Sequence, residues 1–101
     1  MTILESDWKK FTKLKKTALS RFCERVLAEV DAVRAKETLS SHDQYLEIFS
    51  LIEKRDRELA QIFDYHSRSK ALHQLHLIVS RGLLEDEEIS QFSEAMRKVI
   101  E

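Results

Sequence analysis

Apolar positions recur at the spacing of an α-helix in four successive segments of the chain. The first two segments span about residues 6–35 and 41–66, and the short polar loop between them predicts a long antiparallel helix hairpin. Two shorter helices are predicted at about 68–81 and 86–101. The pattern therefore predicts an all-α helical bundle that forms a single domain over residues 1–101.

Capping residues mark where these helices begin and end. Ser6 or Asp7 can cap the first helix, and Ser41 with Gln44 has capping-box spacing at the start of the second. Gly82 is the only glycine, and we expect it to end the third helix in a left-handed conformation.

The apolar stripe of the second segment changes phase beyond Phe63. In an unbroken helix, Leu75 and Val79 would point about 150° away from the stripe that runs from Phe49 to Phe63. We expect a break within residues 64–69 for this reason. The alternative is a continuous helix that packs on both faces.

Composition supports an all-helical chain. One glycine, no proline and no asparagine leave few residues for the tight turns that a sheet needs, whereas helix formers dominate. The single Cys23 cannot form an internal disulfide, and no apolar run is long enough to span a bilayer. These features favour a cytoplasmic protein without membrane contact.

The first predicted helix is long for so short a chain. About 30 residues span roughly 45 Å, and the two shorter helices can cover only part of a hairpin of that length. A second copy of the chain is the simplest way to bury the rest, so we expect a homodimeric bundle.

The segment "EKRDRE" places six charges in a row between two apolar runs. The pairs Glu53–Arg57 and Lys54–Glu58 have i,i+4 spacing, which is typical of a solvated helix face. Asp56 differs because its helical angle places it on the apolar stripe.

A carboxylate on an apolar stripe needs a partner or water. Candidate partners for Asp56 are Lys15 and Glu29, which interrupt the stripe of the first helix, together with Arg25; Arg55 lies beside it. The favoured interpretation is a polar layer that sets helix register or oligomeric state. A ligand-binding carboxylate and simple exposure are the alternatives.

Basic residues dominate the start of the first helix, while the last segment is acidic. Complementarity between them, within the chain or across a dimer, is the favoured interpretation. Lys9, Lys10, Lys13 and Lys16 could instead contact the phosphates of a nucleic acid. A pI near 6.4 is low for a nucleic-acid-binding protein, so this is the second choice.

Histidines offer one possible metal site. His66, His73 and His76 share a helix flank, but this flank carries no carboxylate or cysteine as a third ligand. We therefore expect neither a metal nor another cofactor. The sequence also contains no phosphate loop, nucleophile elbow, HExxH or paired-cysteine motif, which disfavours an enzyme.

One stretch resembles a known enzyme family. "LIEKRDRELAQIF" is similar to the long helix of the small helical chorismate mutases, and "GLLEDEEISQFSEAMRKVI" resembles the end of that fold. The resemblance implies that Arg55 or Arg57 would clamp a substrate carboxylate. The later members of the family's arginine–lysine–glutamate set have no placement on residues 64–82, and the long basic first helix has no counterpart.

These features together predict a non-catalytic helical protein that acts through protein–protein interaction as a homodimer. A nucleic-acid-associated regulator is the alternative, and a helical enzyme of the chorismate-mutase type is a third choice.

Overall fold

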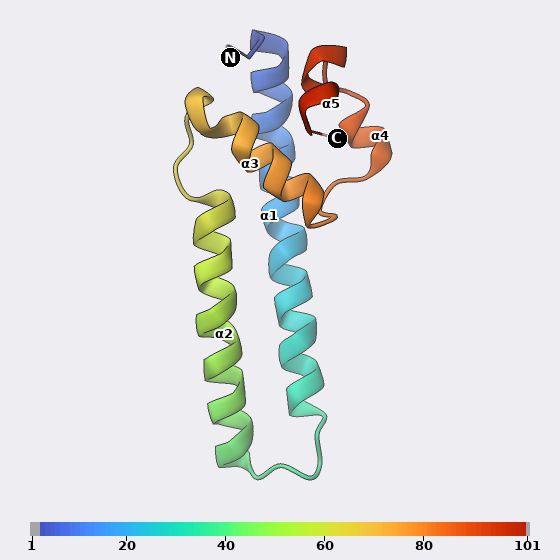
Figure 1. Cartoon of the computed structure of the whole chain (residues 1–101). Coiled ribbons are helices and arrows are strands. Elements are labelled where there is room, and N and C mark those ends of the chain that lie inside the picture. Colours follow the sequence, from blue (N-terminus) through green and yellow to red (C-terminus); the bar gives the residue numbers. More distant parts are fainter. Residues whose placement is uncertain (1–2, 101) are drawn as a thin grey trace.

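A computed structural model describes residues 3–100, and within this range every regular element is a helix. Helix α1 spans Glu5–Arg34, α2 spans Ser41–Phe63, α3 spans Arg68–Ser80, α4 spans Asp86–Ile89 and α5 spans Glu94–Ile100 (Figure 1). The all-α prediction is confirmed. None of the described helices combines the length and the apolar character needed to cross a membrane.

Helices α1 and α2 form the predicted antiparallel hairpin, with extents of 52 × 25 × 19 Å for the whole fold (Figure 1). The buried side chain of Gln44 holds the loop between them. Its Nε2 donates to the Lys36 carbonyl at 3.0 Å, and its Oε1 accepts from Arg34 at 2.8 Å. The expected capping box at Ser41 is therefore wrong. Ser40 is the N-cap instead, and its Oγ accepts from the Asp43 N–H at 3.0 Å.

The chain breaks between α2 and α3, as the phase change predicted. Tyr65 adopts a positive φ of 65°, and α3 then crosses over α1 (Figure 1). The buried Gln74 of α3 donates to the carbonyls of Asp64 at 2.6 Å and Tyr65 at 2.8 Å. Gln74 thereby satisfies backbone groups that the end of a helix leaves without partners.

Gly82 ends α3 as predicted, with a φ of +67°. The Gly82 N–H donates to the Val79 carbonyl at 2.9 Å, and the Leu83 N–H donates to the Ile78 carbonyl at 3.1 Å. This pair of bonds is a Schellman motif, which requires the left-handed conformation that glycine adopts without steric cost. Leu83 then turns back into the core.

The single helix expected at 86–101 is instead two short helices, α4 and α5, and residue 101 lies outside the described range. Ser93 directly precedes α5, and its Oγ accepts from the Met96 N–H at 3.3 Å as an N-cap side chain does. Asp7 of α1 holds this break in place: its carboxylate accepts from the Ser93 N–H at 2.8 Å and the Ser93 hydroxyl at 2.6 Å. Asp7 therefore does not cap α1, whose N-cap is Leu4.

The hydrophobic core lies at one end of the hairpin. There the N-terminal half of α1 and the end of α2 pack with the three later helices; the largest fully buried apolar side chains are Phe11, Ile62, Leu75, Ile78, Leu83 and Met96. The other end, residues 23–34 and 41–56, is called the distal hairpin below. It buries only Val26, Val33 and Gln44.

Replacing Asp7 with alanine should destabilise the fold. The Asp7 side chain is 2% exposed, and its loss leaves the Ser93 N–H and hydroxyl without their acceptor. We expect the free energy of unfolding in urea to fall by about 1–3 kcal/mol. Ser6→Ala, at the exposed neighbouring position, is the control and should change it by less than about 0.5 kcal/mol. Equal effects of the two substitutions would contradict the assigned role of Asp7.

Candidate functional site

Arg55 is the residue of "EKRDRE" that faces the other helix of the hairpin. Its Nε and Nη2 donate to the two carboxylate oxygens of Glu29 on α1, at 3.0 and 2.9 Å. Its Nη1 donates to Glu58, one turn further along α2, at 2.9 Å. A bidentate pair with one carboxylate and a contact with a second hold the guanidinium in one geometry.

The charged groups of this network change one another's pKa values. The hydrogen bonds that Arg55 donates to Glu29 and Glu58 raise the pKa of Arg55, and the same bond to Glu58 lowers the pKa of that carboxyl below its usual range. Arg81 adds a contact with Glu58 at 3.5 Å. The network thus joins α1, α2 and the residue that follows α3.

Arg25 also ties α1 to the end of α3. Its Nη1 donates to the Arg81 carbonyl at 2.8 Å and its Nη2 donates to the Gly82 carbonyl at 2.6 Å. A cation at this position complements the negative end of the helix dipole. Arg25 and Glu29, which the sequence offers as candidate partners of Asp56, therefore bind other groups.

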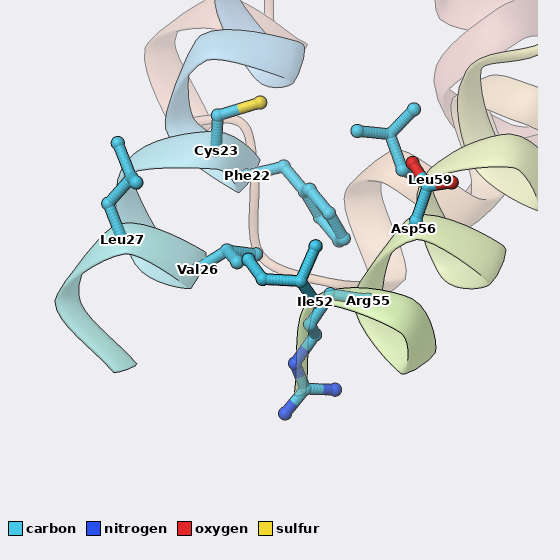
Figure 2. A pocket seen from close by; sticks show the side chains of 8 residues that line it. All are labelled: Phe22, Cys23, Val26, Leu27, Ile52, Arg55, Asp56 and Leu59. Atoms are coloured by element: carbon cyan, nitrogen blue, oxygen red, sulfur yellow. The ribbon is translucent and has the colours of Figure 1, made fainter. Parts of the chain in front are cut away.

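Asp56 is exposed in the single chain. It lies on the rim of a groove between α1 and α2, and in Figure 2 the Arg55 side chain extends away from the Asp56 carboxylate. The groove is lined mostly by apolar side chains from both helices (Figure 2): Phe22, Cys23, Val26, Leu27, Ile52, Arg55, Asp56 and Leu59.

Large apolar side chains extend this groove along the distal hairpin. Leu27 is 59% exposed, Tyr45 65%, Phe49 58% and Ile52 42%. On α2, the angles of Tyr45, Phe49, Ile52 and Asp56 fall within about 60° of one another, so these side chains share one face. The surface formed by Leu27, Tyr45, Phe49, Ile52 and Asp56 is called the hairpin face below.

Lys15 lies beside Phe63 at the end of α2. Its Nζ contacts the Tyr65 carbonyl and the Gln74 Oε1, each at 3.4 Å. Burial lowers the pKa of Lys15, and Asp64 partly opposes this effect. Lys15 therefore supports the turn between α2 and α3, away from Asp56.

His66 packs against the aromatic start of α1. Its ring centroid lies 4.6 Å from that of Trp8, and its ring is parallel to Phe11 within 5°. The His66 Nδ1 lies 3.5 Å from the Lys15 Nζ, which can only donate, so this contact requires a neutral imidazole. Burial lowers the pKa of His66, and the positive charges of Lys15 and Lys16 add to the effect.

The three candidate histidines do not converge. All three are exposed; the His66 ring lies against Trp8 of α1, whereas His73 and His76 are on α3. Across residues 3–100, no group of three or more histidine, cysteine, aspartate or glutamate side chains could hold a metal ion.

The lysines at the start of α1 divide into two groups. Lys9, Lys13 and Lys16 are exposed and fall along one row of the helix, whereas the Lys10 Nζ donates to the Gln91 carbonyl. Arg21, rather than a lysine, engages the acids around α4.

The Arg21 guanidinium donates to Glu88 at 2.6 Å and lies 3.8 Å from Glu85. Its hydrogen bond lowers the pKa of Glu88. Because Arg21 also donates to the Leu83 carbonyl at 2.9 Å, it fixes the segment between α3 and α4 against α1.

Two structural polar residues, Asp7 and Gln74, were absent from the sequence-based candidates. Each lies on an apolar row of its helix: Asp7 precedes Phe11 by one turn, and Gln74 precedes Ile78 by one turn. A polar residue on an apolar row is the signal that identifies Asp56, and the same signal could have identified Asp7 and Gln74. Both are buried with hydrogen-bond partners, whereas Asp56 is exposed.

No protein family, curated protein or solved structure matches the chain. We therefore infer its function from the residues alone. The two arginines that a resemblance to chorismate mutases implied as substrate clamps have other contacts. Arg55 binds Glu29 and Glu58, and Arg57 is exposed and pairs with Glu53 at 3.4 Å.

Arg55→Ala should destabilise the hairpin more than Arg57→Ala does. The first change leaves Glu29 and Glu58 without their shared cation, whereas the second removes only an exposed i,i+4 pair. We expect a loss of about 1 kcal/mol or more for Arg55→Ala and less than about 0.5 kcal/mol for Arg57→Ala, measured by urea denaturation. Equal losses would contradict the assignment of Arg55 to the helix–helix contact.

Acidification should weaken the fold through His66. Because the folded-state pKa of His66 is lowered, the unfolded chain binds a proton first, and stability should fall as the pH drops below the unfolded value of 6.5. The free energy of unfolding between pH 7.5 and 5.5 tests this. His66→Gln should reduce the dependence, and His73→Gln, on the exposed side of α3, should leave it unchanged. An undiminished dependence in His66→Gln would assign it to other groups.

Proposed function

We propose that this protein is a non-catalytic helical protein that acts through protein–protein interaction as a homodimer. The observation that carries the proposal is the hairpin face, which exposes two aromatic and two aliphatic side chains on one side of a helix pair. Apolar patches of several hundred Å² on a soluble protein generally mark interaction sites.

The distal hairpin lacks a third layer. Helices α3 to α5 pack at the opposite end, so nothing among residues 3–100 covers the hairpin face. Burying a large apolar side chain contributes about 1.5–3 kcal/mol, and side chains that are half exposed retain about half of that value. In a two-fold dimer every such contribution counts twice, and two hairpins together complete a four-helix bundle.

The dimensions suit a second copy. The 23 residues of α2 span about 35 Å, and two helices side by side are about 20 Å wide. The hairpin face itself, from Tyr45 to Asp56, takes up about 16 Å of that length and so offers about 300 Å² per copy, and the flanking residues of the two helices would supply the rest of the roughly 800 Å² per partner of a standard specific interface. We also propose a cytoplasmic location, because a chain with a single cysteine cannot form the internal disulfide that would suggest an oxidising compartment.

A nucleic-acid-associated role is the second candidate, favoured by the exposed row of Lys9, Lys13 and Lys16. Binding through such a row would weaken steeply as salt rises. Titration of the chain into nonspecific duplex DNA and single-stranded RNA, first at low salt, discriminates between the two proposals. A salt-dependent shift supports this second role, and no binding at low salt removes it.

Size-exclusion chromatography with light scattering should find a dimer at micromolar concentration. Phe49→Glu places a charge in the middle of the hairpin face and should convert the dimer to a monomer, because burying an unpaired carboxylate is costly. Ser50→Glu introduces the same charge one position along on another side of α2, and it should leave the dimer intact.

Far-UV circular dichroism of both variants separates loss of the dimer from loss of the fold. A wild-type chain that stays monomeric at tens of micromolar would overturn the homodimer proposal. Dissociation by Ser50→Glu as readily as by Phe49→Glu would place the interface elsewhere.

A further inference from the structure

We infer that the two copies pair through antiparallel α2 helices, so that Tyr45 of each copy binds the partner's Asp56. This inference rests on the proposed homodimer and specifies its orientation and its polar contact. It also assigns a role to the one charged side chain on the hairpin face.

The sequence spacing of the α2 residues on the hairpin face favours an antiparallel orientation of the two copies. Tyr45, Phe49, Ile52 and Asp56 follow one another at intervals of four, three and four residues, which is the alternation of the a and d positions of a helical pair. In an antiparallel pair each a position faces a d position. The layers therefore match on both sides of the midpoint between Phe49 and Ile52: Phe49 meets the partner's Ile52, and Tyr45 meets the partner's Asp56.

In the layer that pairs Tyr45 with the partner's Asp56, the two side chains have complementary hydrogen-bonding groups. The Tyr45 hydroxyl is a donor at the end of an apolar ring, and the Asp56 carboxylate is an acceptor. Within one chain the two residues are eleven positions apart, or about 16 Å along the helix, so they cannot meet. Only a second chain in the antiparallel direction brings them together.

The parallel arrangement fails on charge. It would place Asp56 against the partner's Asp56 in a partly desolvated layer, where like charges repel strongly. The antiparallel layer of Tyr45 and Asp56 would therefore select orientation and register at a cost in affinity, as polar positions do in coiled coils.

The rest of the fold leaves this approach open. Arg25, Glu58 and Arg81 line a second groove together with Leu83, and the residue that follows α3 contacts α1 there; Phe22, Val26 and Arg55 lie between the two grooves and line both. The groove with Leu27, Ile52 and Asp56 contains no residue of α3, α4 or α5. The three later helices and the hairpin face therefore use different sides of the hairpin.

A double-mutant cycle on the dimer dissociation constant tests the contact. Tyr45→Phe should raise the Kd, measured by sedimentation equilibrium, about tenfold or more, because the partner's Asp56 stays buried without its donor. In an Asp56→Ala background the same tyrosine change should alter the Kd less than about twofold. Tyr65→Phe, which alters an exposed tyrosine outside the hairpin face, is the control and should leave the Kd of the dimer unchanged.

Disulfide capture tests the orientation in a Cys23→Ser background. Tyr45→Cys mixed with Asp56→Cys should give a cross-linked dimer under mild oxidation, because antiparallel pairing brings the two positions within disulfide range. Asp56→Cys by itself should stay largely uncross-linked. A cross-link formed by Asp56→Cys alone would show a parallel pair and overturn the inference.

The failure of this inference differs from the failure of the proposed function. If the wild-type chain is dimeric but Tyr45→Phe leaves its Kd unchanged, the antiparallel contact is wrong and the homodimer stands. If the wild-type chain is monomeric, both are wrong.

Discussion

Two helices that pack side by side bury only the strips that they turn toward each other, and any further apolar surface needs a third layer. In this protein α3, α4 and α5 supply that layer at one end of the hairpin, where Phe11, Ile62 and Leu75 are each 1% exposed. At the other end none of residues 3–100 forms a third layer, and Phe49 is 58% exposed. The homodimer proposal follows from this imbalance between the two ends.

Polar side chains fix the ends of the later helices, whose apolar faces pack into the core. Asp7 holds the start of α5, Arg21 and Arg25 hold the segments on either side of Gly82, and Gln74 holds the turn before α3. Most of these contacts reach backbone groups that helix ends leave without partners. A chain with one glycine and no proline thus makes its tight connections with side chains.

The "EKRDRE" segment shows where helical periodicity stops being informative. The angular count places Asp56 on one stripe with Phe49 and Ile52, but it cannot say which partner that stripe will face, and in the single chain Asp56 is exposed. In the single chain α1 packs against the flank of α2 that carries the half-buried Ile48 and Leu51, and on that flank Arg55 finds a bidentate partner in Glu29. The apolar stripe with Asp56 is left on the exposed side, where we propose that a second copy binds.

The sequence by itself determined the helical class, the hairpin, the break before α3 and the left-handed end at Gly82, because these depend on local spacing and on backbone freedom. Only the tertiary structure decided which polar residues lie inside. Asp7 and Ser93 are 86 positions apart, and no local rule pairs them or divides the last segment into two helices. Long-range partners decide such contacts, because a buried polar group is stable only where a distant part of the chain supplies its hydrogen bond.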